Sequence, residues 1–174
     1  MIVLYILLGL IALILIIAAL TGKAWNYEQS ILINAPLDKV WTNVGTLHAF
    51  NQWNPWMSLD PNMQLKYTGT DGTPGASFSW DSQVKNAGAG SQTILRVVDR
   101  KLLETRIDFL RPFKGTGLAD FEVTVEKTLT RVSWSIDSST PYPMNIIKLF
   151  GLIEKNMSRD FTRGLGKLKT ICEG

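Results

Sequence analysis

The side chains that most often carry out acid–base or metal chemistry are scarce in this chain. Its 174 residues include one histidine, His48, and one cysteine, Cys172. His48 stands beside Ala49 and Phe50, where we expect a surface or rim position rather than the buried position that a general base needs. One histidine and one cysteine do not supply the ligands of a usual zinc site. We therefore predict no catalytic residue, no metal ligand and no cofactor, and the sequence leans against an enzyme.

The remaining polar candidates are carboxylates and two arginines. The carboxylates alternate with apolar residues along predicted strands, which places them on a solvated outer face; they are Glu104, Asp108, Asp120, Glu122 and Glu126. Arg96 lies between two apolar residues, so alternation does not fix the direction of its side chain. Arg111 begins the predicted loop at Pro112-Phe113, and arginines mostly stay solvated.

The first 22 residues differ from the rest of the chain. Residues 1–20 contain no charged side chain, and a helix of that length spans about 30 Å, the hydrocarbon thickness of a bilayer. No Lys or Arg precedes the apolar run, which favours an uncleaved anchor over a signal peptide. Trp25 and Tyr27 follow where interfacial aromatic residues lie, and Lys23 gives a slight lean toward a cytoplasmic domain. We predict a transmembrane anchor helix in residues 1–22 and one folded domain in residues 24–174.

The pattern of apolar residues predicts the order of elements in residues 24–174. A short strand, a helix that ends at Gly45 and a further helical turn come first, at 28–33, 37–44 and 48–52. Alternation then predicts strands at 63–67, 76–81, 92–98, 103–109, 120–126 and 131–137, with turns at 86–90 and at Gly115-Thr116-Gly117. Apolar residues recur every three or four positions from Ile146 to Leu168, which predicts a helix of about 25 residues.

Each predicted strand has one apolar and one polar face, as in an antiparallel sheet that is covered on one side. A strongly curved sheet wrapped around the amphipathic C-terminal helix buries every apolar face, so we predict an α+β fold. The formal net charge of +3 is small. It argues against a nucleic-acid-binding protein, whose surface normally carries a dense basic face.

This order of elements, together with particular residues, resembles the START-like helix-grip superfamily and, within it, the polyketide cyclase/dehydrase-like (SRPBCC) branch. The residues that carry the resemblance are Ile33-Asn34-Ala35-Pro36, Val40-Trp41, Trp53-Asn54-Pro55-Trp56, Asp60-Pro61, Gly72, Gly75, Trp80, Gly88, Gly90, Pro112-Phe113, Trp134, Asp160-Phe161, Gly164-Leu165 and Leu168. It covers nearly everything after the anchor. The resemblance implies a helix-grip fold with an apolar cavity between sheet and helix, and a hydrophobic ligand such as a lipid, sterol or polyketide. The predicted anchor implies a membrane location, which we expect to be the bacterial cytoplasmic membrane.

The expected lining of that cavity combines inward-facing apolar residues with one arginine, Arg111, which is placed to meet a ligand carboxylate at the cavity mouth. The predicted ligand-binding residues are Trp53, Trp56, Phe78, Trp80, Phe109, Arg111, Phe113, Phe121, Trp134, Phe150, Ile153 and Met157. Such a set suits binding, because apolar burial contributes about 25 cal/mol per Å² without demanding geometry. The same residues also suit a filled core without a cavity. Likewise, Trp53 and Trp56 either form an aromatic lid or pack their proline-rich loop against the sheet.

Three functions remain open from the sequence. The favoured one is a membrane-anchored binding module for a hydrophobic or amphipathic small molecule, lipid-like or polyketide-like. The second is a cyclase or dehydratase acting in the same cavity, which requires a polar pair that the predicted lining does not clearly supply. The third is an interaction or stress-response domain that binds no ligand. The basic face of the last helix either rests on anionic headgroups or is an ordinary solvated face; it comprises Lys148, Lys155, Arg159, Arg163, Lys167 and Lys169.

Overall fold

The computed structural model describes residues 1–174. Its elements, in chain order, are α1 (Ile2–Leu20), β1 (Ala24–Ile33), α2 (Leu37–Val44), α3 (Leu47–Trp53), the 3₁₀ helix η1 (Pro55–Leu59), β2 (Gln64–Thr68), β3 (Ser77–Asp81), β4 (Ala89–Val98), β5 (Leu102–Arg111), β6 (Gly115–Glu126), β7 (Leu129–Ser139), the 3₁₀ helix η2 (Met144–Phe150) and α4 (Leu152–Glu173).

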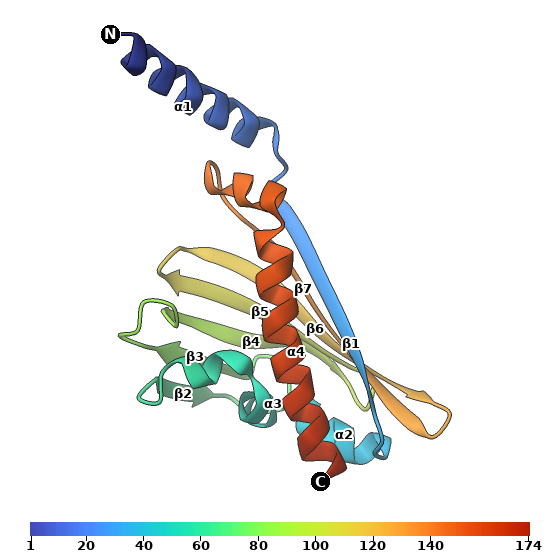
Figure 1. Cartoon of the computed structure of the whole chain (residues 1–174). Coiled ribbons are helices and arrows are strands. Elements are labelled where there is room, and N and C mark those ends of the chain that lie inside the picture. Colours follow the sequence, from blue (N-terminus) through green and yellow to red (C-terminus); the bar gives the residue numbers. More distant parts are fainter.

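The seven strands form one antiparallel sheet in the order β1-β7-β6-β5-β4-β3-β2. The sheet curves, and the long helix α4 runs across its concave side, with α2 beside the C-terminal end of that helix (Figure 1). This arrangement is the α+β helix-grip fold that the sequence predicts. The apolar strand faces and the apolar stripe of α4 bury one another, which is the physical reason for the layering.

The strand register defines two ends of the sheet. At one end Ala24 pairs with Ser139, and Asp81 and Arg111 both face Ala89 across their ladders. We call this the α1 end, because α1 leads into β1 there. We call the opposite end, where β1 runs out and the chain enters α2, the far end. Both terms recur below, because the two ends of the sheet are packed differently.

Helix α1 stands away from the folded domain (Figure 1). An 18-residue window of it has a mean hydropathy of 3.2, so the helix is long and apolar enough to cross a membrane. Its last turn contacts η2: the Asn145 side-chain amide donates hydrogen bonds to the carbonyls of Ala18 (2.7 Å) and Thr21 (2.6 Å). Asn145 thereby adds hydrogen bonds to carbonyl groups at the C-terminus of α1, where few backbone donors remain.

The core contains 22 buried residues, all between Ile33 and Cys172. Residues of α1 take no part in this core. Val40, Val44, Leu47 and Phe50 bring α2 and α3 into the core, at relative exposures of at most 2%. Since burial of apolar surface is the main favourable term in folding, the sheet, α2, α3 and α4 stabilise one another without α1.

Three predicted boundaries are wrong, and the ladder hydrogen bonds explain why. Strand β1 begins at Ala24 rather than at residue 28, because its pairing with β7 continues to Ser139. The predicted turn at 86–90 overlaps β4, which starts at Ala89, and the predicted turn at 115–117 is the start of β6. Glycine marks turns in many sequences, but Gly90 serves a close approach here: a Cβ on it would lie 2.6 Å from the Trp80 ring.

The C-terminal helix is shorter than predicted. The sequence pattern predicts one helix from Ile146, whereas the structure has η2 followed by α4 from Leu152. Gly151 separates them with φ of 61°, in the left-handed region that glycine adopts at little cost. The chain turns at this residue, so Phe150 does not continue the apolar stripe of α4.

Candidate ligand-binding site

A cavity of about 300 Å³ lies inside the curved sheet, and α3, η1 and α4 cover it. It is lined by 21 residues, of which 15 are hydrophobic. Every layer contributes to the lining: Trp56 and Met57 come from η1, Met157 from α4, and Phe78 and Ile107 from the sheet. The interior of this domain is therefore partly hollow, unlike a core that side chains fill completely.

A set of aromatic rings that we call the aromatic cluster closes the inner side of the cavity. Its members are Phe50, Trp53, Phe121, Trp134 and Phe161. Trp134 stacks on Phe161 of α4 with 3.9 Å between ring centroids, and its other neighbours Phe121 and Trp53 lie at 5.5 and 5.4 Å. Phe50 and Trp134 line the cavity, whereas the other three lie outside its lining.

The mouth of the cavity lies at the α1 end of the sheet. Three residues of the lining are solvent-exposed: Asn86 in the β3–β4 loop, and Arg111 and Pro112 at the β5–β6 loop. Trp25, the second residue of β1, pairs with Ser138 of β7, and both line the same part of the cavity. Because exposed lining residues mark where a cavity meets solvent, the opening is at the end of the sheet that α1 adjoins.

The cavity brings together seven of the twelve residues predicted to bind ligand, namely Trp56, Phe78, Trp80, Phe109, Arg111, Trp134 and Met157. The other five lie outside its lining. Trp53 and Phe121 are buried in the aromatic cluster, and Ile153 is buried on α4. Phe113 and Phe150 are 62% and 70% exposed. Phe113, which the family resemblance singled out, lies in the β5–β6 loop, and Phe150, which helical spacing singled out, precedes the break at Gly151.

The two tryptophans of the proline-rich segment have different environments. Trp53 ends α3, is fully buried, and donates its indole N–H to the carbonyl of Asn43 at 2.8 Å. Trp56 lies in η1, remains partly exposed, and donates its indole N–H to the Asp160 carboxylate at 3.3 Å. Trp56 also lines the cavity. The packing interpretation therefore holds for Trp53, while Trp56 presents its ring to the cavity.

Several lining residues were missed by the sequence analysis, among them Trp25, Phe50, Met57, Gln92 and Ser138. Trp25 looked like an interfacial aromatic residue because it follows the apolar helix so closely. Gln92 is polar on an apolar strand face, so a pattern of hydrophobicity passes over it. Its spacing did carry a signal, because Gln92 is two residues from the buried Ile94 and must share its face.

The two candidate arginines face different environments. Arg111 lines the mouth, where its guanidinium forms an ion pair with the Asp81 carboxylate and also donates to the carbonyl of Ser82 at 3.4 Å. A ligand carboxylate at the mouth would compete with Asp81 for this guanidinium. Arg96 points to the outer face, 3.6 Å from the Glu104 carboxylate, and takes no part in the cavity.

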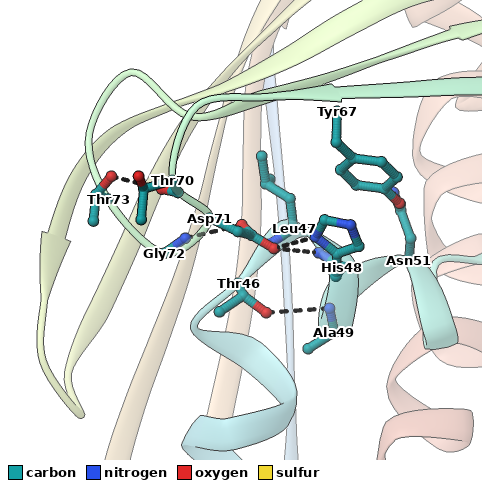
Figure 2. A network of polar contacts seen from close by, with 10 residues as sticks. All are labelled: Thr46, Leu47, His48, Ala49, Asn51, Tyr67, Thr70, Asp71, Gly72 and Thr73. Atoms are coloured by element: carbon teal, nitrogen blue, oxygen red, sulfur yellow. Dashed lines mark hydrogen bonds and ion pairs between the residues drawn. The ribbon is translucent and has the colours of Figure 1, made fainter.

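His48 lies outside the cavity, at the start of α3 (Figure 2). Its Nδ1 is 2.6 Å from Oδ2 of Asp71, and its ring stacks on Tyr67 with 3.7 Å between centroids. Asp71 also accepts hydrogen bonds from the backbone N–H groups of Leu47, His48 and Gly72. Partial burial raises the pKa of Asp71, but these hydrogen bonds outweigh that effect and hold its pKa below the ordinary value. The network ties α3 to the β2–β3 loop.

The five carboxylates predicted to face outward lie outside the cavity lining. Asp120 is opposite Glu104 on the neighbouring strand and close to Glu122 and Asp137. Partial burial raises the pKa of Asp120, and the negative charges of these neighbours raise it further. No three His, Cys, Asp or Glu side chains are placed to hold a metal ion.

Fold and site together define the class of the protein, an α+β helix-grip domain in which a curved antiparallel sheet and a long helix enclose an apolar cavity. A family model described as polyketide cyclase / dehydrase and lipid transport matches residues 24–173. The chain belongs to this family. The comparison with curated proteins gave no match.

Solved structures share the fold at low sequence identity. A protein of unknown function from Staphylococcus aureus is 11% identical with a TM-score of 0.65, over 87% of this chain and 94% of that one. A protein from Chromobacterium violaceum is 14% identical with a TM-score of 0.60, over 86% and 97%. The di-domain ARO/CYC BexL of the BE-7585A biosynthetic pathway is 15% identical with a TM-score of 0.59, over 87% and 51%. At such identities the likeness establishes the fold and not the activity.

Proposed function

We propose that this protein is a membrane-anchored binding module for a hydrophobic or amphipathic small molecule, lipid-like or polyketide-like. One observation carries the proposal: the apolar cavity opens at the end of the sheet where α1 leads into β1. Burial of apolar ligand surface against a mostly hydrophobic lining supplies the affinity. The family description, which includes lipid transport, agrees with a ligand of this class.

The membrane half of the proposal depends on α1. We place residues 1–22 in the bilayer as a single-pass anchor and residues 24–174 outside it as the folded domain. A hydropathy of 3.2 and a length of 19 residues suit a span. The ammonium group of Lys148 donates to the carbonyl of Gly22 at 3.1 Å, so two basic residues, Lys23 and Lys148, adjoin the end of the span. Positive flanks favour the cytoplasmic side of a bacterial membrane.

Exposed apolar side chains around the mouth support contact between the α1 end and the bilayer. We call this set the membrane rim; it comprises Val84, Leu110, Phe113, Tyr142, Met144, Leu149, Phe150 and Leu152. They lie in the β3–β4 loop, around the β5–β6 loop and around η2, which are all at the α1 end. Apolar patches of this kind on a soluble surface mark interaction sites. Resting the rim on the bilayer would bring the mouth to the phase where apolar ligands concentrate.

The polar content of the lining favours binding over a cyclase or dehydratase reaction. Arg111 is the one ionisable side chain in the lining, and arginine stays protonated in proteins. The lining therefore offers no general base or acid within reach of an enclosed ligand. The same cavity argues against an interaction domain whose core is completely filled.

Methionine methyl NMR tests ligand entry, because three methionines line the cavity: Met57, Met63 and Met157. The full-length protein, labelled with ¹³C at its methionine methyl groups and held in nanodiscs, is titrated with 2-methoxynaphthalene. We expect these three signals to shift, while Met1 and Met144, which lie outside the lining, report only on partitioning into lipid. Shifts confined to Met1 and Met144 would contradict the proposal.

Two variants at neighbouring positions provide the control. Ala119 of β6 lines the cavity, and Leu118 beside it is exposed on the other face of the strand. Ala119→Phe should fill the cavity and abolish the shifts of the cavity methionines, whereas Leu118→Phe should leave them unchanged. Equal responses of both variants would show that the probe binds elsewhere.

The membrane rim is tested separately by quenching. A cysteine introduced as Phe113→Cys is labelled with bimane in the full-length protein, since the native Cys172 is buried. Lipids that carry a doxyl group near the headgroup should quench this label. A matched label at Leu95→Cys, which is also exposed but lies on β4 away from the mouth, should be unaffected. Equal quenching at both positions, or none at Phe113→Cys, would refute the docking of the rim.

A further inference from the structure

One residue of the cavity is not explained by the binding of a purely apolar ligand. Gln92 of β4 lines the cavity and is 3% exposed. Its neighbours across the ladders are Phe78 of β3 and Ile107 of β5, both apolar and both in the lining. Burying a carboxamide among such residues costs free energy unless its polar atoms are paired. A leucine would fill the same place without that cost.

Thr105 determines which way the Gln92 carboxamide faces. The Thr105 hydroxyl donates its proton to the carbonyl of Ala119 at 2.9 Å, so toward Gln92 its oxygen can only accept. Nε2 of Gln92 donates to that oxygen, also at 2.9 Å. The nitrogen and oxygen of an amide are assigned from such networks, and this network directs the nitrogen to Thr105. Oε1 of Gln92 accepts no hydrogen bond from the protein. It is also not one of the unpaired side-chain atoms that are shielded from solvent, so it is open to the cavity.

The other hydrogen-bonding side chains of the lining are already engaged or lie at the mouth, apart from Trp134. Its indole N–H is enclosed without a partner, but it is a donor and not an acceptor. The Asn54 amide donates to Oδ1 of Asn51 at 3.0 Å, and its oxygen accepts from the backbone N–H of Trp56. The Ser138 hydroxyl donates to the carbonyl of Thr116 at 2.8 Å. Arg111 pairs with an acidic residue, and Asn86 is exposed. Gln92 is thus the buried lining residue with an unengaged hydrogen-bond acceptor.

We infer that Gln92 is a specificity-determining residue whose Oε1 accepts a hydrogen bond from a hydroxyl group of the bound ligand. This inference rests on the proposed function and narrows its ligand class to apolar molecules that carry a hydroxyl group. A hydrocarbon or an ether of the same shape leaves the buried oxygen unpaired, and an ionised carboxylate offers it no proton. Sites that hydrogen-bond a ligand hydroxyl reject analogues that lack it far better than apolar sites reject size differences.

A pair of probes of similar shape tests this inference in the full-length protein in nanodiscs. 2-Naphthol has a donor, and 2-methoxynaphthalene has only the ether oxygen. Dissociation constants come from titration of the methyl signals of Met57, Met63 and Met157. We expect the native protein to prefer 2-naphthol by about tenfold and Gln92→Met to bind both probes equally. Partitioning of each probe into lipid is the same for both proteins and cancels from the comparison.

Two further variants keep the test decisive. Thr105→Val retains the side-chain volume but releases the carboxamide, and we expect the preference to fall below about threefold. Thr93→Val, at the neighbouring position that faces away from Gln92, should keep the native preference. Unfolding midpoints of all variants establish that they are folded.

The outcomes separate this inference from the function on which it rests. Equal binding of both probes to the native protein, or an undiminished preference in Gln92→Met, would overturn the role of Gln92 and leave the binding module in place. Failure of both probes to shift the cavity methionines would instead contradict the proposed function itself.

Discussion

The two ends of the sheet hold similar side chains in opposite states of packing. Toward the far end, the aromatic cluster is closed, with rings stacked as closely as 3.9 Å between centroids. Toward the α1 end, Trp80 and Phe109 lie 6.2 Å apart and border a cavity of about 300 Å³. Aromatic residues therefore do two things in one domain. They supply stability where their rings pack against one another, and they leave room for a ligand where one side is open.

Two tryptophans allow the sharpest test of this difference, because each donates its indole N–H to a backbone carbonyl. Trp53 is fully buried and bonds to Asn43, whereas Trp80 borders the cavity and bonds to Ala87. Trp53→Ala should cost about 3–5 kcal/mol of unfolding free energy, since it opens a void in the aromatic cluster. Denaturant unfolding followed by circular dichroism in nanodiscs measures the loss, and Trp53→Phe serves as a milder variant if the alanine variant fails to fold.

The matching substitution at the α1 end, where the cavity opens, should lower the unfolding free energy by less. Trp80→Ala removes a side chain that already lacks neighbours on its cavity side, so we expect a loss of about 1–3 kcal/mol. Its larger effect should appear in the methionine titration, as weaker binding of 2-methoxynaphthalene. If Trp80→Ala proves as destabilising as Trp53→Ala, the contrast between a packed end and an open end is wrong.

The hydrogen-bonded Asp71 carboxylate at the far end provides a third test. Its loss should have a smaller effect on the unfolding free energy, with a defined pH dependence. The folded pKa of Asp71 lies below its ordinary value, so the ionised carboxylate stabilises the fold at neutral pH and that contribution disappears as the pH falls through the folded pKa. Asp71→Asn should therefore cost about 1–2 kcal/mol at pH 7. The gap between the two proteins should close as the pH falls below about 4, and a gap independent of pH would exclude the charge as its cause.

Removal of a carboxylate charge from the outer face of the sheet should change the unfolding free energy in the opposite direction, and by the smallest amount. The folded pKa of Asp120 is raised, so its ionised form destabilises the fold above that pKa and the penalty vanishes below the unfolded pKa. Asp120→Asn should raise the unfolding free energy at pH 7 by less than about 0.5 kcal/mol and change nothing below about pH 4. The ligand titration should be unaffected, because Asp120 lies outside the cavity. A stability loss at pH 7 would contradict the assigned sign.

The fold was predictable from the sequence because its signals are periodic. Alternation located the strands, and the three-to-four spacing located α4, although Gly151 hides a break that only its left-handed backbone reveals. The cavity was less predictable, because strand alternation distinguishes inside from outside but not a filled interior from a hollow one. Trp53 and Trp56 are three residues apart and chemically identical, yet one is in the packed cluster and the other borders the cavity.

Polar residues on the apolar inner face of the sheet were the hardest part of the site to predict. Gln92 takes part in the site through a hydrogen bond to Thr105, thirteen residues away in sequence on the next strand. No local pattern encodes such a pairing, since it depends on the register between β4 and β5. Loop residues such as Phe113, which lies outside the lining, are hard to place for a related reason, because periodicity carries no information where the strand ends.

Photochemical labelling by a membrane-borne ligand tests the central claim most directly. A long-chain alcohol that carries a diazirine in its alkyl chain is added to nanodiscs containing the full-length protein, illuminated, and its adducts are located by peptide mass spectrometry. The account predicts adducts on cavity residues such as Met57, Trp80 and Met157, and their loss in Ala119→Phe but not in Leu118→Phe. Adducts confined to α1 and the membrane rim in the native protein would show that the alcohol stays in the bilayer, and would contradict a ligand-binding cavity.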